Sequence, residues 1–168
     1  MNRISSAARL LAMTIVFATT GASAAGTDAN KEVAAIQAVD EVFVKAYNSG
    51  DVATVVAQYD DHAVLQAPGS PEVVGKAAIR TYFSADIPEA AKAGAKFVLN
   101  PGATGGVSGD LGWSSGTFVV KGHDGQVLDK GKYLSVSRKV KGKWLYVRDM
   151  WNSDAAPAAP EPAATPKK

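Results

Sequence analysis

Asp149 is the residue of this sequence best suited to general acid–base chemistry. It lies in the segment Lys143–Asn152, whose residues predict a β-strand. Alternation along that strand puts Asp149 on the same face as Leu145 and Trp151, which has the character of a core face, and puts Tyr146 on the opposite face. A carboxyl group on an apolar face has a raised pKa, as a base acting near neutral pH requires. Alternatively, Asp149 pairs with an arginine or caps a neighbouring loop.

Aromatic and hydroxyl side chains on the expected strands predict an apolar pocket. On the segment Leu111–Lys121, alternation places Trp113, Ser115 and Thr117 on one face. If this is the inner face, Trp113 forms part of an aromatic wall for a flat apolar ligand, and the two small residues offer space and hydrogen bonds. Otherwise the aromatic residues are ordinary core and the hydroxyl residues are simply strand formers. The residues expected to line the pocket are Tyr59, Trp113, Ser115, Thr117, Tyr133, Trp151 and Asn152.

The sequence offers little for a metal, a cofactor or a covalent nucleophile. It contains no cysteine and two histidines, so thiolate zinc sites and cysteine nucleophiles are excluded. His62 follows two aspartates, but adjacent residues do not converge on one ion unless the backbone curls around it; a solvated turn is the simpler interpretation. The glycine-rich stretch Gly102–Gly109 lacks the strand-to-helix setting of a phosphate loop and predicts a mobile loop at the pocket rim, a potential lid. We expect no metal and no cofactor.

Length and composition indicate one globular domain. The chain has 168 residues, of which 46% are hydrophobic and 20% are charged. This composition excludes a wholly disordered, collagenous or coiled-coil chain. The two ends differ in composition from the middle, so the sequence divides into three segments: 1–24, 25–154 and 155–168.

The first segment has the pattern of a cleaved secretory signal peptide. Arg3 and Arg9 supply a positive start, an apolar run follows, and Ala22-Ser23-Ala24 is a small-x-small cleavage pattern. The apolar run is shorter than the roughly 20 residues that span a bilayer, which argues against the alternative of an uncleaved anchor. We therefore expect cleavage after Ala24 and a periplasmic or secreted protein with no membrane attachment after signal removal.

The last segment, 155–168, is rich in alanine and proline and predicts a disordered, solvated tail. Whether it is a spacer or a docking peptide stays open. The two ends also carry the chain's basic character. Without them the net charge changes from +2 to −1, so the composition does not support a nucleic-acid partner.

Three helices are expected in the first half of the domain. They cover residues 29–47, 52–59 and 76–85, where apolar residues recur every three or four positions. Asp28 and Asp51 are the expected N-caps of the first two helices, and Gly50 ends the first. The apolar side of the second helix includes Tyr59. Pro88 interrupts the third helix.

A short strand, Ala63–Ala67, follows the second helix, and from Lys96 onward the sequence predicts an antiparallel sheet. The expected strands of this sheet are Lys96–Asn100, Leu111–Lys121, Lys130–Val140 and Lys143–Asn152. Gly122–Gly125 and Lys141-Gly142 provide tight turns. Helices followed by strands are the order of an α+β fold, in which helices pack on one face of a curved sheet.

Several short motifs, in this order and spacing, resemble the nuclear transport factor 2-like superfamily. They are Asn48–Asp51, Ala57–Leu65, Pro68-Gly69 and Gly75–Arg80. The ending, Gly131–Leu134 through Lys143-Trp144 to Arg148–Asp154, is similar to the uncharacterised SnoaL-like and ketosteroid-isomerase-like bacterial branch. The resemblance covers Ala29–Asp154. It implies a cone-shaped, cystatin-like fold of about three helices wrapped by a bent sheet, a pocket between them, and dimerisation through the sheet.

The same resemblance argues against ketosteroid isomerase activity. In those relatives a carboxylate base follows the strand just before the proline turn, and the matching residue here is Ala67. They also place a tyrosine on the first helix, five residues before the Asn of the turn, and the matching residue is Phe43. Neither side chain takes or donates a proton.

Three functions stay open at this point. The leading hypothesis is an exported homodimer that binds a small, largely apolar molecule. The second is an isomerase, cyclase or hydrolase with Asp149 as general base and Tyr59, Tyr133 or Asn152 as hydrogen-bonding partners. The third is a protein-interaction module with a filled cone, acting through its sheet or its tail.

Overall fold

The computed structural model describes residues 22–155, so the expected signal segment up to Gly21 and the tail beyond Ala155 lie outside the described residues. The elements of the described part follow in the order α1 (Ala22–Ser49), α2 (Val52–Ala57), β1 (Tyr59–Gln66), β2 (Val73–Val74), α3 (Lys76–Lys92), β3 (Lys96–Leu99), β4 (Thr104–Ser108), β5 (Leu111–Lys121), β6 (Val127–Val140) and β7 (Lys143–Ser153). Within residues 22–155, no helix has both the length and the apolar character needed to cross a membrane.

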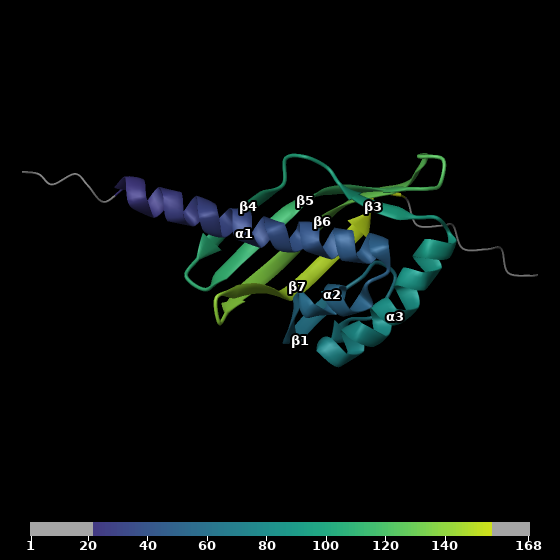
Figure 1. Cartoon of the computed structure of the whole chain (residues 1–168), viewed down its shortest axis with the longest axis horizontal. Helices are drawn as coiled ribbons and strands as arrows, with labels where there is room; N and C mark the ends of the chain where they lie inside the picture. Colours follow the sequence, from purple (N-terminus) through teal and green to yellow (C-terminus); the bar gives the residue numbers. More distant parts are fainter. Residues whose placement is uncertain (1–21, 156–168) are drawn as a thin grey trace, which may run out of the picture.

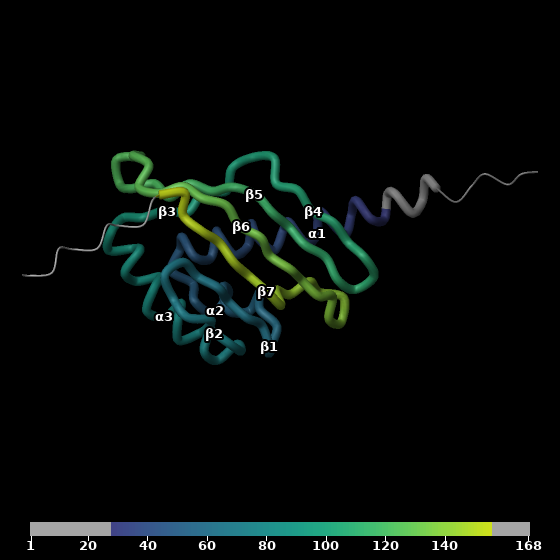
Figure 2. Tube along the Cα trace, turned by 180° about the vertical axis from the view of Figure 1, so that it is seen from behind, coloured from purple at the N-terminus to yellow at the C-terminus, as the bar shows by residue number. Residues whose placement is uncertain are grey.

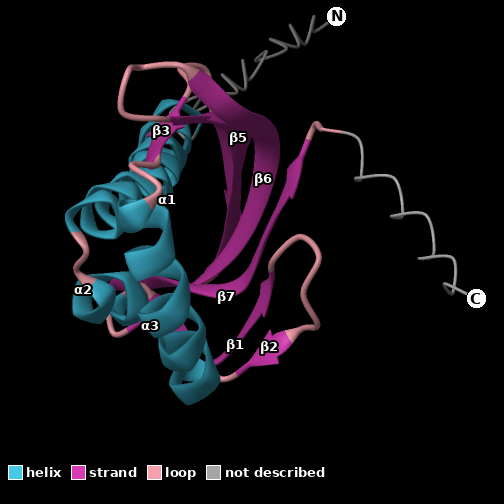
Figure 3. Cartoon of the chain, turned by 90° about the vertical axis from the view of Figure 1, so that its right-hand side faces the viewer, coloured by secondary structure: helices cyan, strands magenta, loops and turns pink. Residues whose placement is uncertain are grey.

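The strands form one curved sheet, and the helices lie on its inner side (Figures 1 and 3). The strand order is β2-β1-β7-β6-β5-β3, and β4 also pairs with β5. This confirms the α+β class with helices packed on a curved sheet. The strands from Lys96 onward pair antiparallel, as the sequence predicts, and the earlier strand β1 runs parallel to β7. A long segment of chain, and no hairpin, joins these two strands, so nothing forces them to be antiparallel.

Helix α1 lies along the inner face of the sheet and supplies one side of the core. Its buried residues include Ile36, Val39 and Ala46, at the three- and four-residue spacing of the sequence pattern. They belong to one apolar cluster with Val55 of α2 and Phe83 of α3. Seen from behind, β5, β6 and β7 cross over α1 (Figure 2). The other elements therefore pack against the long helix α1.

Two helices are longer than the sequence predicted. Helix α1 begins at Ala22, and not after Asp28; three of the six residues before Asp28 are alanine, the best helix former. Helix α3 continues through Pro88 to Lys92. A proline removes one backbone donor from the helix, but Ile87 beside it is buried in the core. Packing of the second half of α3 thus outweighs the tendency of Pro88 to end the helix.

The chain between α1 and β1 follows the expected caps but not the expected strand boundary. Gly50 ends α1 with a φ of 83°, and the Asp51 side chain caps α2 by accepting a hydrogen bond from the Thr54 N–H at 2.9 Å. Tyr59 opens β1 and does not extend α2, since its register opposite β7 places it in the core. His62 is an exposed residue of the same strand and does not lie in a turn.

The glycine-rich segment forms a strand, and the predicted rim loop is wrong. Residues Thr104–Ser108 make β4, which pairs with β5 over five positions. A Cβ on Gly105 would lie 3.0 Å from Val33 of α1, and a Cβ on Gly106 would lie 2.6 Å from the Trp113 indole nitrogen. The glycines therefore let α1 and Trp113 lie close against the two faces of β4.

The two faces of β5 are the reverse of the predicted ones. Gly112, Ser114 and Phe118 are buried on the inner side, whereas Trp113 is 41% exposed on the outer side. A Cβ on Gly112 would lie 2.2 Å from the end of the Ile36 side chain. Because α1 approaches β5 this closely, the inner face requires small residues and the large indole points outward.

A β-bulge decides which residues of β7 face the helices. Val136 and Ser137 are neighbours on β6, but their partners on β7 are two residues apart, so Val147 is an extra residue. Regular alternation puts Tyr146 and Asp149 on opposite faces. With the bulge both are buried on the inner face, 2% and 7% exposed. The predicted outward position of Tyr146 is therefore wrong.

Candidate functional site

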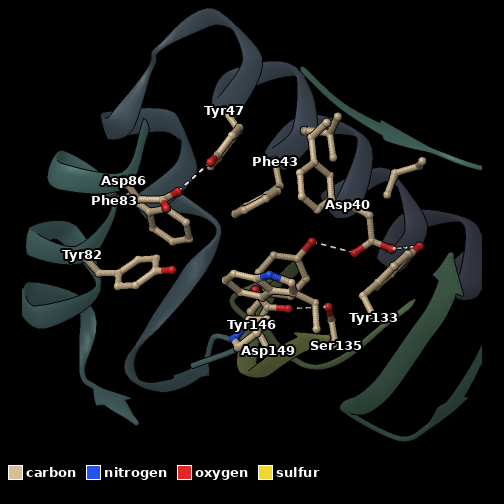
Figure 4. Close-up of a pocket in the computed structure, with 15 residues that line it drawn as sticks. Asp40, Phe43, Tyr47, Tyr82, Phe83, Asp86, Tyr133, Ser135, Tyr146 and Asp149 are labelled. Atoms are coloured by element: carbon tan, nitrogen blue, oxygen red, sulfur yellow. Dashed lines mark hydrogen bonds between the residues drawn. The ribbon is translucent and has the colours of Figure 1, made fainter. Parts of the chain in front are cut away.

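A cavity of about 220 Å³ lies between α1, α3 and the inner face of the sheet. Figure 4 shows its lining, with side chains from both helices and from β6 and β7 pointing toward one another. Eight of its fifteen lining residues are aromatic. The lining residues are Asp40, Phe43, Val44, Tyr47, Pro68, Tyr82, Phe83, Asp86, Phe97, Leu99, Tyr133, Ser135, Tyr146, Asp149 and Trp151.

Asp149 of β7 is held in this cavity by two hydroxyl groups. The Tyr59 hydroxyl donates to its Oδ2 at 2.5 Å, and the Ser135 hydroxyl donates to its Oδ1 at 2.8 Å. Burial raises the pKa of the Asp149 carboxyl to about 6, although these two hydrogen bonds act to lower it. Both oxygens thus have a donor, yet desolvation still favours the neutral acid.

Asp40 of α1 is a second buried carboxyl, and it also lies under tyrosine hydroxyls. Tyr146 donates to its Oδ1 at 2.6 Å and Tyr133 donates to its Oδ2 at 3.3 Å (Figure 4). Burial raises the pKa of Asp40, and the two tyrosine hydrogen bonds oppose the rise. Charge on Asp40 further raises the pKa of Asp149, so the two acids repel each other when both are ionised.

A third tyrosine–carboxyl pair joins the two helices at the side of the cavity away from Asp40. The Tyr47 hydroxyl of α1 donates to Oδ2 of Asp86 on α3 at 2.6 Å. Burial and the neighbouring Asp86 raise the pKa of Tyr47, and burial raises the pKa of Tyr82 to about 12. These phenols are therefore neutral and act as hydrogen-bonding groups near pH 7.

The pairing of the strands assembles these groups. Ser135 lies directly opposite Asp149, and Tyr133 lies opposite Trp151, in the β6–β7 ladder. Tyr59 lies opposite Tyr146 in the β1–β7 ladder. Each of these pairs therefore has its members side by side on the inner face.

Phe43 of α1 stands at the centre of the aromatic part of the cavity. Its ring centre lies 5.6 Å from that of Phe83 and 6.3 Å from those of Tyr59 and Tyr146. The interplanar angles of these pairs are 70–72°, the edge-to-face geometry that aromatic rings favour. Phe43 matches the tyrosine of the isomerase pattern, so an apolar ring takes the place of a proton donor.

Four of the eight predicted site residues meet at this cavity. Asp149, Tyr133 and Trp151 line it, and Tyr59 lies behind Asp149 as its hydrogen-bond donor.

The other four lie elsewhere, and their predicted positions are wrong. Trp113 is on the outer face. The Ser115 hydroxyl donates to the Tyr133 carbonyl at 2.9 Å, and the exposed Thr117 accepts a hydrogen bond from Asn100. Asn152 is exposed on β7. Trp113, Ser115 and Thr117 lie away from the cavity because the two faces of β5 are the reverse of the predicted ones. Asn152 directly follows Trp151, which lines the cavity, so its side chain points to the opposite face of β7.

Sequence reasoning missed Asp40, Tyr146, Ser135 and the Tyr47–Asp86 pair. Asp40 carries a usable signal, because it follows Val39 and precedes Phe43 on the apolar side of α1, where a carboxyl is costly unless it has a function or a partner. Tyr146 could not be found without knowing the bulge. In the described part of the chain, no three His, Asp or Glu side chains are grouped so as to hold a metal ion.

Comparison with known proteins relates the chain to one family and to one fold. The family model of the SnoaL-like domain matches residues 39–147, and among curated proteins none matches. Solved structures with the same fold include an NTF2-like protein with a cystatin-like fold from Novosphingobium aromaticivorans, 18% identical, covering 82% of this chain and 89% of that one with a TM-score of 0.69.

Two further structures agree with this fold. One is a protein of unknown function with a cystatin-like fold from Nostoc punctiforme, 18% identical, covering 75% of this chain and 92% of that one with a TM-score of 0.64. The other is a ketosteroid isomerase-like protein from Erwinia carotovora atroseptica, 22% identical, covering 76% of this chain and 99% of that one with a TM-score of 0.59. At these identities the likeness concerns the fold.

The raised pKa of Asp149 predicts a specific dependence of stability on pH. The folded chain keeps a proton on this carboxyl up to about pH 6, whereas the unfolded chain loses it near the ordinary pKa of 3.8. The stabilisation is therefore complete below pH 3.8 and is lost as the pH rises through 6, by on the order of 3 kcal/mol. Urea unfolding from pH 4 to 7 should show the wild type losing stability relative to Asp149→Asn. A difference between the two proteins that does not vary with pH would contradict the burial of this acid.

Proposed function

The chain belongs to the SnoaL-like domain family, and we propose that it binds a small, largely apolar molecule in the cavity between α1, α3 and the sheet. The observation that carries this proposal is the cavity itself, with its eight aromatic lining residues and its few buried polar groups. Concave, mostly apolar sites with a small number of placed polar groups are typical of small-molecule binding. An open cavity also favours binding over an interaction module with a filled cone.

The volume of the cavity limits the size of the molecule. A cavity of about 150 Å³ holds a benzene ring, and this cavity measures about 220 Å³. It thus has room for a single ring with a short substituent. A four-ring steroid does not fit within this volume, in agreement with the absence of the isomerase residues at Ala67 and Phe43.

We predict that a single-ring alcohol binds in this cavity and that a bulky side chain blocks it. Titration of the ¹⁵N-labelled protein with benzyl alcohol should give saturable shifts at residues around Phe43, Tyr82 and Trp151. Val44 lines the cavity from α1, so Val44→Trp should fill it and abolish the shifts. Val127→Trp, at an exposed position of β6 outside the cavity lining, is the matched control and should bind as the wild type does. Shifts that persist in Val44→Trp, or an absence of shifts in the wild type, would contradict the proposal.

A second candidate function is proton transfer with Asp149 as general base. The specific observation in its favour is the buried carboxyl with a pKa of about 6, at the wall of a cavity that also presents the phenol of Tyr133. A base with this pKa is ionised near neutral pH and basic enough to accept a proton from a weakly acidic C–H. The Tyr59 hydroxyl donates to the Asp149 carboxylate, and Tyr133 is one of the tyrosines that line the cavity beside it.

This candidate is tested by hydrogen exchange in a small ketone. If Asp149 is the base, the protein should catalyse exchange of the methyl hydrogens of acetophenone with D₂O, at a rate that rises with pH through about 6. Asp149→Asn should abolish the catalysis while retaining binding of benzyl alcohol. Exchange that is equally fast in Asp149→Asn would exclude Asp149 as the base.

We also propose that the protein is exported and forms a homodimer through the outer face of the sheet. The signal pattern ending at Ala24 supports export. The outer face carries an exposed apolar patch of Leu111, Trp113, Leu134 and Met150, each 40–43% exposed. Leu134 and Met150 are directly paired across β6 and β7. A continuous exposed apolar patch is typical of an interaction surface, and a twofold dimer buries the same patch on both copies.

One measurement tests export and dimer formation together. Native mass spectrometry of the protein recovered from a bacterial periplasm should give the mass of a dimer of chains that begin at Ala25. Leu134→Glu should give a monomer with the same N-terminus, because a charge on the patch disfavours its burial. Chains that retain Met1 would contradict export, and a wild-type monomer would contradict the dimer.

A further inference from the structure

The polar groups of the cavity are mostly hydrogen-bond acceptors. The hydroxyls of Tyr133 and Tyr146 donate to Asp40, and that of Ser135 donates to Asp149. The Tyr47 hydroxyl likewise donates to Asp86. A hydroxyl has one hydrogen to donate, so these four groups present oxygen lone pairs to the cavity. A molecule that binds beside them must bring its own donors.

The cavity also collects negative charge without a positive partner. Asp40, Asp86 and Asp149 come from α1, α3 and β7, and all three line the same space (Figure 4). Among the fifteen lining residues in the described part of the chain, none is Lys, Arg or His. Tyrosine hydroxyls satisfy the carboxylate oxygens but do not neutralise them, and a buried charge without a counter-ion is costly.

The rings around these acids are suited to a cation. Phe43, Tyr82, Phe83 and Trp151 surround the same space. The faces of aromatic rings attract cations, most strongly when the cation is removed from water, and cages of such rings recognise substituted ammonium groups. A protonated amine supplies the hydrogen-bond donors and the positive charge that the lining of this cavity lacks. Its charge also makes favourable contacts with the aromatic rings.

We infer that the molecule bound in this cavity is an organic cation, a protonated amine attached to a single apolar ring. The inference rests on the proposed binding function and deepens it by assigning the charge of the ligand. The ammonium group lies between the carboxyls of Asp40 and Asp149, donates to oxygens of the cavity wall, and relieves the repulsion between the two acids. The ring of the ligand packs among the aromatic residues toward α3.

The test is a series of single-ring ligands that differ in charge. Benzylammonium, benzyl alcohol and benzoate have the same ring and similar size. Their dissociation constants for the full-length wild type at pH 7.5 can be measured by NMR titration. We expect benzylammonium to bind at least about tenfold more tightly than benzyl alcohol, since a desolvated ammonium group is attracted both by the ring faces and by the acids. Benzoate should not bind, because the acids repel it.

Variants separate the charge effect from a general loss of binding. Asp149→Asn should reduce the preference for benzylammonium over benzyl alcohol, and Asp110→Asn, an exposed acid in the turn between β4 and β5, should leave it unchanged. If Asp149→Asn does not fold, Asp40→Asn gives the same test at the other carboxyl beside the ammonium group. Benzyl alcohol binding as tightly as benzylammonium would overturn the inference and leave the proposed function intact. Absence of binding by all three ligands would overturn both.

Discussion

The burial of two carboxyl groups under tyrosine hydroxyls is the constraint on which the rest of this structure depends. Asp40 and Asp149 lie on elements far apart in sequence, and each is 5–7% exposed. Without donors such groups would be prohibitively costly to bury. Tyr146 from β7 and Tyr59 from β1 meet this requirement only if α1, β1 and β7 hold fixed positions. The polar pairs thus specify how the helices and the sheet fit together.

Two features of the sheet make that fit possible. The extra residue Val147 turns Tyr146 and Asp149 toward the same side, so that one strand supplies a donor for Asp40 and the carboxyl for Tyr59. Small inner residues on β5 let α1 approach closely; a side chain at Gly112 would collide with Ile36. The bulge and the small residues lie outside the cavity lining, yet they set the positions of the side chains that line it.

Much of the fold follows from sequence patterns, and much of the site does not. The helix face around Ile36, the cap at Asp51 and the strand Leu111–Lys121 all agree with the sequence prediction, because each reflects a local preference. The facing of Trp113 and the position of Tyr146 could not be derived. The first depends on contact with a distant helix, and the second on a one-residue irregularity that leaves no mark in the alternation. Asp149 was predicted from its alternation with Leu145 and Trp151. Its predicted inward side agrees with the structure because Trp151 follows the bulge as Asp149 does, although Leu145 precedes it.

The cavity holds two buried, desolvated acids, and titration of these two groups is the most direct test of the structure described above. The carboxyl ¹³C resonances of the labelled protein can be followed from pH 3 to 8 and assigned with Asp40→Asn and Asp149→Asn. We predict a midpoint near 6 for Asp149 and one above the ordinary range for Asp40. Midpoints near 3.8 for both carboxyls, the value of a solvated aspartate, would contradict it.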